Sequence, residues 1–224
     1  MSAAPLAPGL ALIFDMDGVV IDSNPLHRES WTEFNRRHGL ETTEEMLARM
    51  YGRRNDEIVR DFFGDSLSLD EVLARGAAKE ELYRRMLQDR LEESLTPGLR
   101  AFLNAYAGAP KALATNAEPA NVNFLLDRAQ LRPYFCIVVS GDQVHNPKPH
   151  PEIYLKAADM LGVPAPNCIV FEDSYVGVEA ALAAGMRVVG VCTTHEDLLG
   201  TGITVHNFVG GSLHEWLAGQ TRLV

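Results

Sequence analysis

The sequence feature that most constrains the fold is an apolar run at residues 11–20 (ALIFDMDGVV), in which two carboxylates one residue apart are followed by a glycine. A short aliphatic and aromatic run closed by a glycine is typical of a buried strand in a parallel sheet. Ligands bind beyond the carboxyl ends of such strands, so we expect Asp15 and Asp17 to face one. A turn at Gly18 would separate the two acids into a nucleophile and a proton donor. The residues also fit an Asp-Gly turn whose carboxylates only accept loop amides.

The rest of the chain divides into a helical segment and an alternating one. Residues 24–95 show helical patterns without strand-like alternation, beginning with a predicted helix from 24 to about 38, and Thr96-Pro97-Gly98 ends them abruptly. Beyond residue 98, apolar runs typical of strands alternate with helical patterns. The predicted strands are 111–115, 136–140, 168–171, 187–191 and 203–205, and the predicted helices are 119–129, 151–161, 176–184 and 212–217.

This alternation predicts an α/β fold, a doubly wound parallel sheet with helices on both faces. We expect residues 1–23 and 96–224 to form this Rossmann-like core. Residues 24–95 are predicted to form a small inserted α-helical domain, which two hinges join to the core.

Composition and charge exclude several classes of protein. With 46% hydrophobic and 22% charged residues the chain is an ordinary globular protein. A formal net charge of −10 argues against a protein that binds nucleic acid or anionic membranes over a wide surface. The sequence has no signal-peptide pattern and no run of transmembrane length, so we expect a cytoplasmic protein. We also expect it to be a monomer or a weak dimer. Cys136, Cys168 and Cys192 form no C-x-x-C pair, and each is predicted to be a small buried hydrophobic residue.

Polar residues that can reach a phosphate or a metal ion follow the predicted strands of the core. Because the carboxyl ends of parallel strands meet at one edge of the sheet, we expect these side chains to gather there. In chain order they are Asp15, Asp17, Thr115, Asn116, Lys148, Glu172 and Asp173.

This ordered set resembles the four motifs of the haloacid dehalogenase superfamily. The matching stretches are DMDGV at 15–19, TN at 115–116, NPKPHPE at 146–152 and EDSYVG at 172–177, so the resemblance covers nearly the whole chain. It implies that Asp15 attacks phosphorus to form an aspartyl phosphate and that Asp17 is the general acid and base. It also implies that Lys148 and Thr115 bind the phosphoryl oxygens.

The resemblance further implies a magnesium site. Carboxylates of Asp15 and Asp173 and the backbone carbonyl of Asp17 would be ligands, which suits the preference of Mg²⁺ for oxygen. Glu172 would either complete the ligand set or accept hydrogen bonds behind it. Two interpretations without a catalytic role stay open. Lys148 could be a solvated loop lysine, and Thr115 could cap the helix predicted from 119.

The position of the helical insert narrows the reaction. True dehalogenases lack an acid two residues after the nucleophile, so Asp17 implies phosphoryl chemistry. An insert directly after the first motif resembles the α-helical cap of the subfamily that contains phosphoglycolate phosphatases, sugar-phosphate phosphatases and β-phosphoglucomutase. Such a cap closes over the site and admits small substrates only, so the implied partner is a small phosphorylated metabolite of the sugar phosphate or phosphoglycolate type.

Residues of the cap are the candidates for substrate recognition, together with Asn116 of the core. His27 and Lys79 match a histidine and a lysine of β-phosphoglucomutase, although many phosphatases share both. The interpretations without a role in binding are that His27 is a packing histidine and that Lys79 is a surface lysine. A recognition loop follows, and its candidate residues are Gly52, Arg53, Arg54 and Asn55.

That loop favours a phosphatase over a mutase. Mutases carry an arginine three residues after the glycine to hold a distal phosphate, and Asn55 cannot form the bidentate clamp of an arginine. Arg53 and Arg54 either replace it from a shifted position or are solvated charges. We therefore predict a Mg²⁺-dependent phosphatase, with a phosphosugar mutase as the alternative and a phosphometabolite sensor without catalysis as a weaker one.

Overall fold

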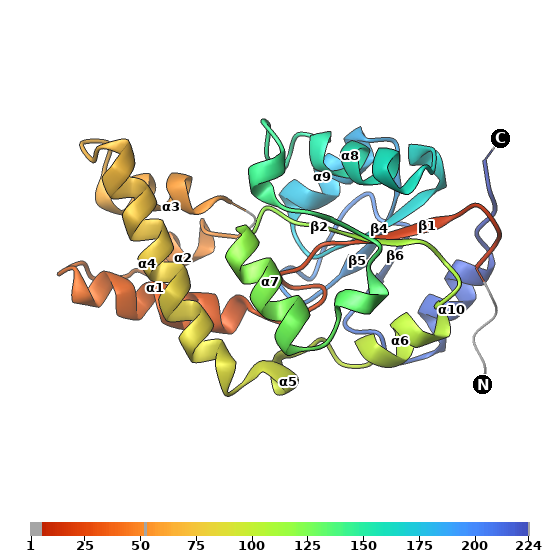
Figure 1. Ribbon diagram of the computed structural model, residues 1–224, viewed down its shortest axis with the longest axis horizontal. Helices are drawn as coiled ribbons and strands as arrows, with labels where there is room; N and C mark the ends of the chain where they lie inside the picture. The colour runs from red at the N-terminus through yellow and green to blue at the C-terminus, as the bar shows by residue number, and fades with distance from the viewer. Residues whose placement is uncertain (1–5, 52, 224) are drawn as a thin grey trace.

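The computed structural model describes residues 6–51 and 53–223, and its centre is a parallel six-stranded sheet (Figure 1). The strand order is β3-β2-β1-β4-β5-β6. The strands are β1 (Ala11–Phe14), β2 (Lys111–Ala114), β3 (Ile137–Val139), β4 (Cys168–Glu172), β5 (Arg187–Val191) and β6 (Ile203–Val205). This sheet confirms the predicted α/β fold, and the strands after β1 begin and end within about one residue of the predicted bounds.

The central strand β1 covers the first four residues of the apolar run and ends directly before Asp15. It pairs with β2 on one side and β4 on the other, and all four of its residues are buried. The chain then leaves the sheet in a tight turn, where the carbonyl of Met16 accepts hydrogen bonds from the amides of Val19 and Val20. This turn agrees with the turn expected at Gly18, and Val19 and Val20, the last residues of the apolar run, are buried in it.

Helices cover both faces of the sheet, as the alternation predicts. Leu12 and Phe14 of β1 pack with α6, α7 and α10 on one face, whereas Ala11 and Ile13 pack with α8 and α9 on the other (Figure 1). These helices are α6 (Leu99–Ala105), α7 (Pro119–Arg128), α8 (Glu152–Leu161), α9 (Tyr175–Ala183) and α10 (Gly211–Ala218), and the short 3₁₀ turns are η1 (Arg132–Tyr134), η2 (Gly141–Gln143) and η3 (Ala165–Asn167). Helix α6 is the one of these five that the sequence patterns did not predict.

The remaining helices lie beside the carboxyl edge of the sheet, around a hydrophobic cluster of their own (Figure 1). That cluster contains Trp31, Phe34 and Phe62. Its helices are α1 (Asn24–Arg37), α2 (Glu44–Ala48), α3 (Asn55–Phe63) and α4 (Leu69–Gln88). The short α5 (Leu91–Ser94) is the exception, because its Leu91 packs in the core cluster of the sheet. Pro25 starts α1, and a capping box between Ser68 and Glu71 starts α4.

The segments that enter and leave these helices run side by side. The amide of Asp22 donates to the carbonyl of Ser94 at 2.8 Å, and the amide of Thr96 donates to the carbonyl of Val20 at 3.2 Å. From this double crossing we propose that residues 24–95 form the inserted cap, with its hinges at these two segments.

The three cysteines differ in their exposure to solvent. Cys168 is buried as predicted, but Cys192 is only partly buried and Cys136 is exposed, so that prediction was wrong for Cys136. All three are free thiols.

Over residues 6–51 and 53–223, no helix combines the length and apolar character needed to cross a bilayer.

Candidate active site

The polar residues predicted at the strand ends gather at the carboxyl edge of the sheet. Asp15 directly follows β1, Thr115 follows β2 and Asp173 follows β4, and all three are buried. With the predicted cap residues that the structure describes, they line a single cavity of about 520 Å³ between the sheet and helices α1, α3 and α4. Gly52 lies outside the described residues.

Lys148 lines this cavity and lies between two carboxylates. Its Nζ atom lies 2.7 Å from Asp15 Oδ1 and 2.6 Å from Glu172 Oε1, and it donates to the carbonyl of Ala114 at 3.2 Å. Burial opposes its charge, but the charges and hydrogen bonds of Asp15 and Glu172 outweigh burial and raise the pKa of Lys148. Interpreting Lys148 as a solvated loop lysine was therefore wrong.

Glu172 has its carboxylate fully committed to protein groups. Oε1 accepts from Lys148 and from the hydroxyl of Tyr154 at 2.7 Å, and Oε2 accepts from the amides of Asp173 and Ser174 and from the Ser174 hydroxyl. A Cβ atom at Gly177 would lie 1.8 Å from Oε1, so only glycine fits beside this carboxylate. These contacts favour Glu172 as the residue that anchors the loop and orients Lys148.

Three buried carboxylates nevertheless lie close enough to share a cation. One oxygen each of Asp15, Glu172 and Asp173 fall within 4.8 Å of one another. Burial and the neighbouring charges raise the pKa of Asp173 well above its usual range, and burial, Glu172 and Asp17 raise the pKa of Asp15 to about 7 against the opposing effect of Lys148. Like charges held together in this way fit a hard divalent cation.

The loop after β5 completes this part of the site, which the sequence analysis missed. Thr194 Oγ1 donates a hydrogen bond to Asp173 Oδ2, and Thr193 Oγ1 donates to the carbonyl of Gly18 at 2.6 Å. Asn24, at the start of α1, also donates to Asp173 Oδ2 at 3.4 Å. The two threonines carry the same signal as the predicted residues, because they too are polar residues just beyond a strand of the sheet.

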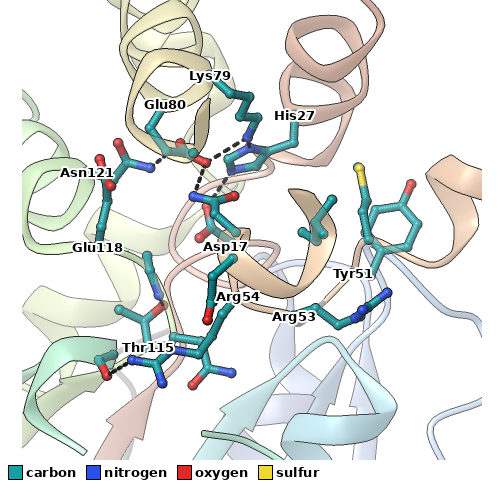
Figure 2. A pocket seen from close by; sticks show the side chains of 18 of the residues that line it. Asp17, His27, Tyr51, Arg53, Arg54, Lys79, Glu80, Thr115, Glu118 and Asn121 are labelled. Atoms are coloured by element: carbon teal, nitrogen blue, oxygen red, sulfur yellow. Dashed lines mark hydrogen bonds and ion pairs between the residues drawn. The ribbon is translucent and has the colours of Figure 1, made fainter. Parts of the chain in front are cut away.

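Asp17 lies beyond the strand, at the border between the sheet and α1. Its Oδ1 atom accepts from the Ser23 hydroxyl at 2.6 Å and lies 3.4 Å from His27 Nε2. The other ring nitrogen of His27 lies 2.7 Å from Lys79 Nζ, so α1 and α4 meet here (Figure 2). Lys79 is 1% exposed, which excludes a surface lysine, whereas His27 also stacks on Tyr83 and so packs as well.

The predicted recognition loop supplies three different kinds of contact. Arg53 pairs with Glu57 and Asp61 along the edge of the cavity. Arg54 reaches across to the sheet side, where its Nη2 atom donates to the carbonyl of Gly141 at 2.7 Å (Figure 2). Asn55 lines the cavity, and its Nδ2 atom donates to Glu80 Oε1 at 2.8 Å.

Two candidates of the core have local partners as well. Thr115 Oγ1 accepts from the amide of Ala117 at 3.1 Å, and Thr115 lines the cavity. The interpretation of Thr115 as the cap of the following helix was wrong, because the N-cap residue of α7 is Glu118 and no side chain of the described residues caps it. Asn116 Oδ1 accepts from the backbone amide of Lys148 at 3.4 Å and so ties the two motif loops together.

Comparison with known proteins assigns this arrangement to a family. A family model described as haloacid dehalogenase-like hydrolase matches residues 10–185. The chain is 36% identical over 182 residues to a fructose-1-phosphate phosphatase of Escherichia coli, covering 80% of this chain and 95% of that protein. It is also 36% identical over 193 residues to a phosphorylated carbohydrates phosphatase of Thermotoga maritima, covering 84% of this chain and 87% of that protein.

A solved structure supports the same fold. The crystal structure of β-phosphoglucomutase from Clostridium difficile superimposes with a TM-score of 0.82 at 24% identity, covering 92% of this chain and 96% of that one. At this level of identity the likeness concerns the fold alone.

Proposed function

The chain belongs to the haloacid dehalogenase-like hydrolase family, and we propose that it is a Mg²⁺-dependent phosphatase of small phosphorylated carbohydrates. The observation that carries this proposal is the placement of Asp15 and Asp17 on one cavity, with Lys148 and Thr115 beside them. A nucleophile, a separate acid and two groups for phosphoryl oxygens are the parts that transfer of a phosphoryl group through an enzyme carboxylate requires.

The substrate class follows from the cavity and from the named relatives. The relatives include phosphatases of fructose 1-phosphate and of phosphorylated carbohydrates. The cavity of about 520 Å³ has room for a small sugar phosphate, and its wall combines apolar side chains such as Trp31 and Ile58 with hydrogen-bonding ones. Helices α1, α3 and α4 contribute to its lining opposite the sheet, which supports a small metabolite rather than a polymer as substrate.

In the proposed mechanism the Asp15 carboxylate attacks phosphorus, and the bond between phosphorus and the sugar oxygen breaks. Asp17 gives its proton to the leaving sugar oxygen, then takes a proton from the water that attacks the aspartyl phosphate, and inorganic phosphate is released. Lys148 and Thr115 hold the phosphoryl oxygens. The carboxylates of Asp15 and Asp173 and the backbone carbonyl of Asp17 would hold Mg²⁺, which when bound neutralises negative charge at the phosphoryl group.

A phosphosugar mutase is the second candidate, because the contact between His27 and Lys79 matches the pair in β-phosphoglucomutase. Against it stands Asn55, which is bonded to Glu80 at the position where a mutase needs an arginine. A mutase would convert β-glucose 1-phosphate into glucose 6-phosphate in the presence of a bisphosphate and release no phosphate.

The test measures inorganic phosphate released from sugar phosphates, phosphoglycolate and β-glucose 1-phosphate, with Mg²⁺ and with EDTA. The Asp15→Asn variant is the blank. We expect Mg²⁺-dependent release from sugar phosphates by the wild type only. Isomerisation without release would establish the mutase, and binding without any turnover would leave a sensor.

A further inference from the structure

A buried carboxylate that the proposed mechanism does not use lies on the cap side of the cavity. Glu80 of α4 is 2% exposed, and its neighbours come from three helices (Figure 2). Oε1 accepts from Lys79 Nζ and from Asn55 Nδ2, each at 2.8 Å, and Oε2 accepts from Asn121 Nδ2 at 2.5 Å. Asn121 lies on α7, so this one carboxylate joins two cap helices to a helix of the core.

The contact between α4 and α7 extends beyond Glu80. Arg84, one turn further along α4, donates to Asn121 Oδ1 at 2.7 Å and pairs with Glu118 at 2.6 Å. Glu118 is the residue just before α7, three residues after Thr115. The same helix contact therefore lies next to the loop that carries the predicted phosphoryl-binding threonine.

Charge fixes Glu80 in this place. Burial would raise the pKa of Glu80, but the ammonium of Lys79 and the hydrogen bonds from Lys79 and Asn121 outweigh burial and lower the pKa to about 2. Lys79 is just as buried, and removing either partner would leave an uncompensated charge inside the protein. The pair is thus held in one geometry.

From Glu80 a line of polar contacts leads to Asp17. An ammonium group can only donate, so the contact of 2.7 Å between Lys79 Nζ and His27 Nδ1 makes Nδ1 the acceptor. The ring proton of a neutral His27 then lies on Nε2, which faces Asp17 Oδ1 at 3.4 Å. Lys79 thereby selects the tautomer that can donate to Asp17.

We propose that Glu80 is a positioning residue for the acid and base Asp17. It holds the Lys79 ammonium against His27, and its bond to Asn121 makes the orientation of His27 depend on the seating of α4 against α7. This inference rests on the proposed role of Asp17 as the proton donor to the leaving group.

The test compares Glu80→Gln with Glu81→Gln, because Glu81 is the exposed neighbour on the same helix. Two substrates separate positioning from general damage: a sugar phosphate, whose leaving oxygen needs a proton, and p-nitrophenyl phosphate, whose leaving group needs none. We expect Glu80→Gln to lower kcat/KM for the sugar phosphate about tenfold to a hundredfold and for p-nitrophenyl phosphate less than about twofold. Glu81→Gln should match the wild type on both, and equal losses on both substrates would overturn the proposal.

A second variant and a spectroscopic measurement cover the case in which Glu80→Gln does not fold. Asn121→Ala keeps the Lys79–Glu80 pair but removes the bond that ties Glu80 to α7, and we expect a smaller loss with the same dependence on the leaving group. Nitrogen NMR of the wild-type His27 ring should place the proton on Nε2. A proton on Nδ1 would contradict the proposal even if the protein released no phosphate, whereas failure of all substrates with the expected tautomer would count against the proposed function alone.

Discussion

Lys148 Nζ lies 2.7 Å from Asp15 Oδ1, although 133 positions separate the two residues in the chain. The contact joins the residue after β1 to the loop that follows β3 and η2 in the chain. The carboxylate of Glu172 accepts from the same ammonium group at 2.6 Å. A nucleophile in this position is shielded from water and stays next to a fixed positive charge.

Replacing Lys148 should abolish most of the activity. Lys148→Met keeps an unbranched side chain of nearly the same length but removes the charge, and we expect kcat/KM to fall about a hundredfold to a thousandfold, as when a preorganised donor is lost. Lys156→Met is the control, because Lys156 lies on α8 and bonds only the carbonyl of Gln143 among the contacts of the described chain. Steady-state phosphate release measures both, and a Lys148→Met enzyme within tenfold of the wild type would refute the role.

Mg²⁺ should stabilise the protein, and more at high pH than at low pH. The folded pKa values of Asp15 and Asp173 are raised from 3.8, so without metal these groups stabilise the fold below pH 3.8, and this stability is lost as the pH rises through about 7 for Asp15. Bound Mg²⁺ offsets that repulsion. We expect a larger rise in Tm at pH 8 than at pH 5, measured by thermal unfolding with and without Mg²⁺.

Asp173→Asn gives the matched test of the same cation site. We expect this variant to have a higher Tm than the wild type without Mg²⁺, because a repelling charge is gone, and to lose the Tm response to Mg²⁺. Asp159→Asn, at an exposed position of α8, should keep the wild-type response. An unchanged Mg²⁺ response in Asp173→Asn would rule out this site.

Gly18 and Gly39 form a pair that separates backbone strain from damage to the site. Both have positive φ, at 78° and 73°, so alanine costs about 1 kcal/mol of stability at either position. A Cβ atom at Gly18 would lie 1.9 Å from Asp173 Oδ2, whereas Gly39 has nothing within 4 Å. Urea unfolding and activity should show Gly39→Ala mildly destabilised and active, and Gly18→Ala inactive; an active Gly18→Ala would contradict the close approach.

Glu80 should contribute stability that depends on pH. Its folded pKa of about 2 lies below the usual 4.5, so its contribution is present above pH 4.5 and is lost as the pH falls towards 2. The shift corresponds to a contribution on the order of 3 kcal/mol. In urea titrations the difference in unfolding free energy between wild type and Glu80→Gln should shrink over this range, and a constant difference would mean that Glu80 is not held as a charge.

The sequence predicted the sheet and the residues at its edge because both follow from local patterns. Apolar runs of strand length alternate with helical patterns, and each strand ends in a polar residue, so even the gathering of Asp15, Lys148 and Asp173 could be expected. The turn after β1 could be expected from Gly18, but the burial of Val19 and Val20 in that turn could not, because apolar residues look the same in a buried turn as in a strand.

Contacts between cap and core were beyond the reach of these patterns. Glu80 has the sequence neighbourhood of a solvated helix face, and its burial depends on Asn121, which lies 41 positions away on another helix. In the sequence, Asn55 stands where a mutase has an arginine. Its hydrogen bond to Glu80 could not be predicted from that position. The exposure of Cys136, just before the edge strand β3, could not be predicted for the same reason. It depends on the order of the strands in the sheet, which no single segment of the sequence determines.

The most direct test of the central claim is capture of the phosphorylated enzyme. Asp17→Asn should react with p-nitrophenyl phosphate, whose leaving group needs no proton, and should then hydrolyse the intermediate slowly because the base is gone. After acid quenching and proteolysis, mass spectrometry should find one phosphoryl group on the peptide that contains Asp15, and none when Asp15→Asn is added. A phosphoryl group on a different peptide, or none while nitrophenolate is still released in repeated turnovers, would contradict the account.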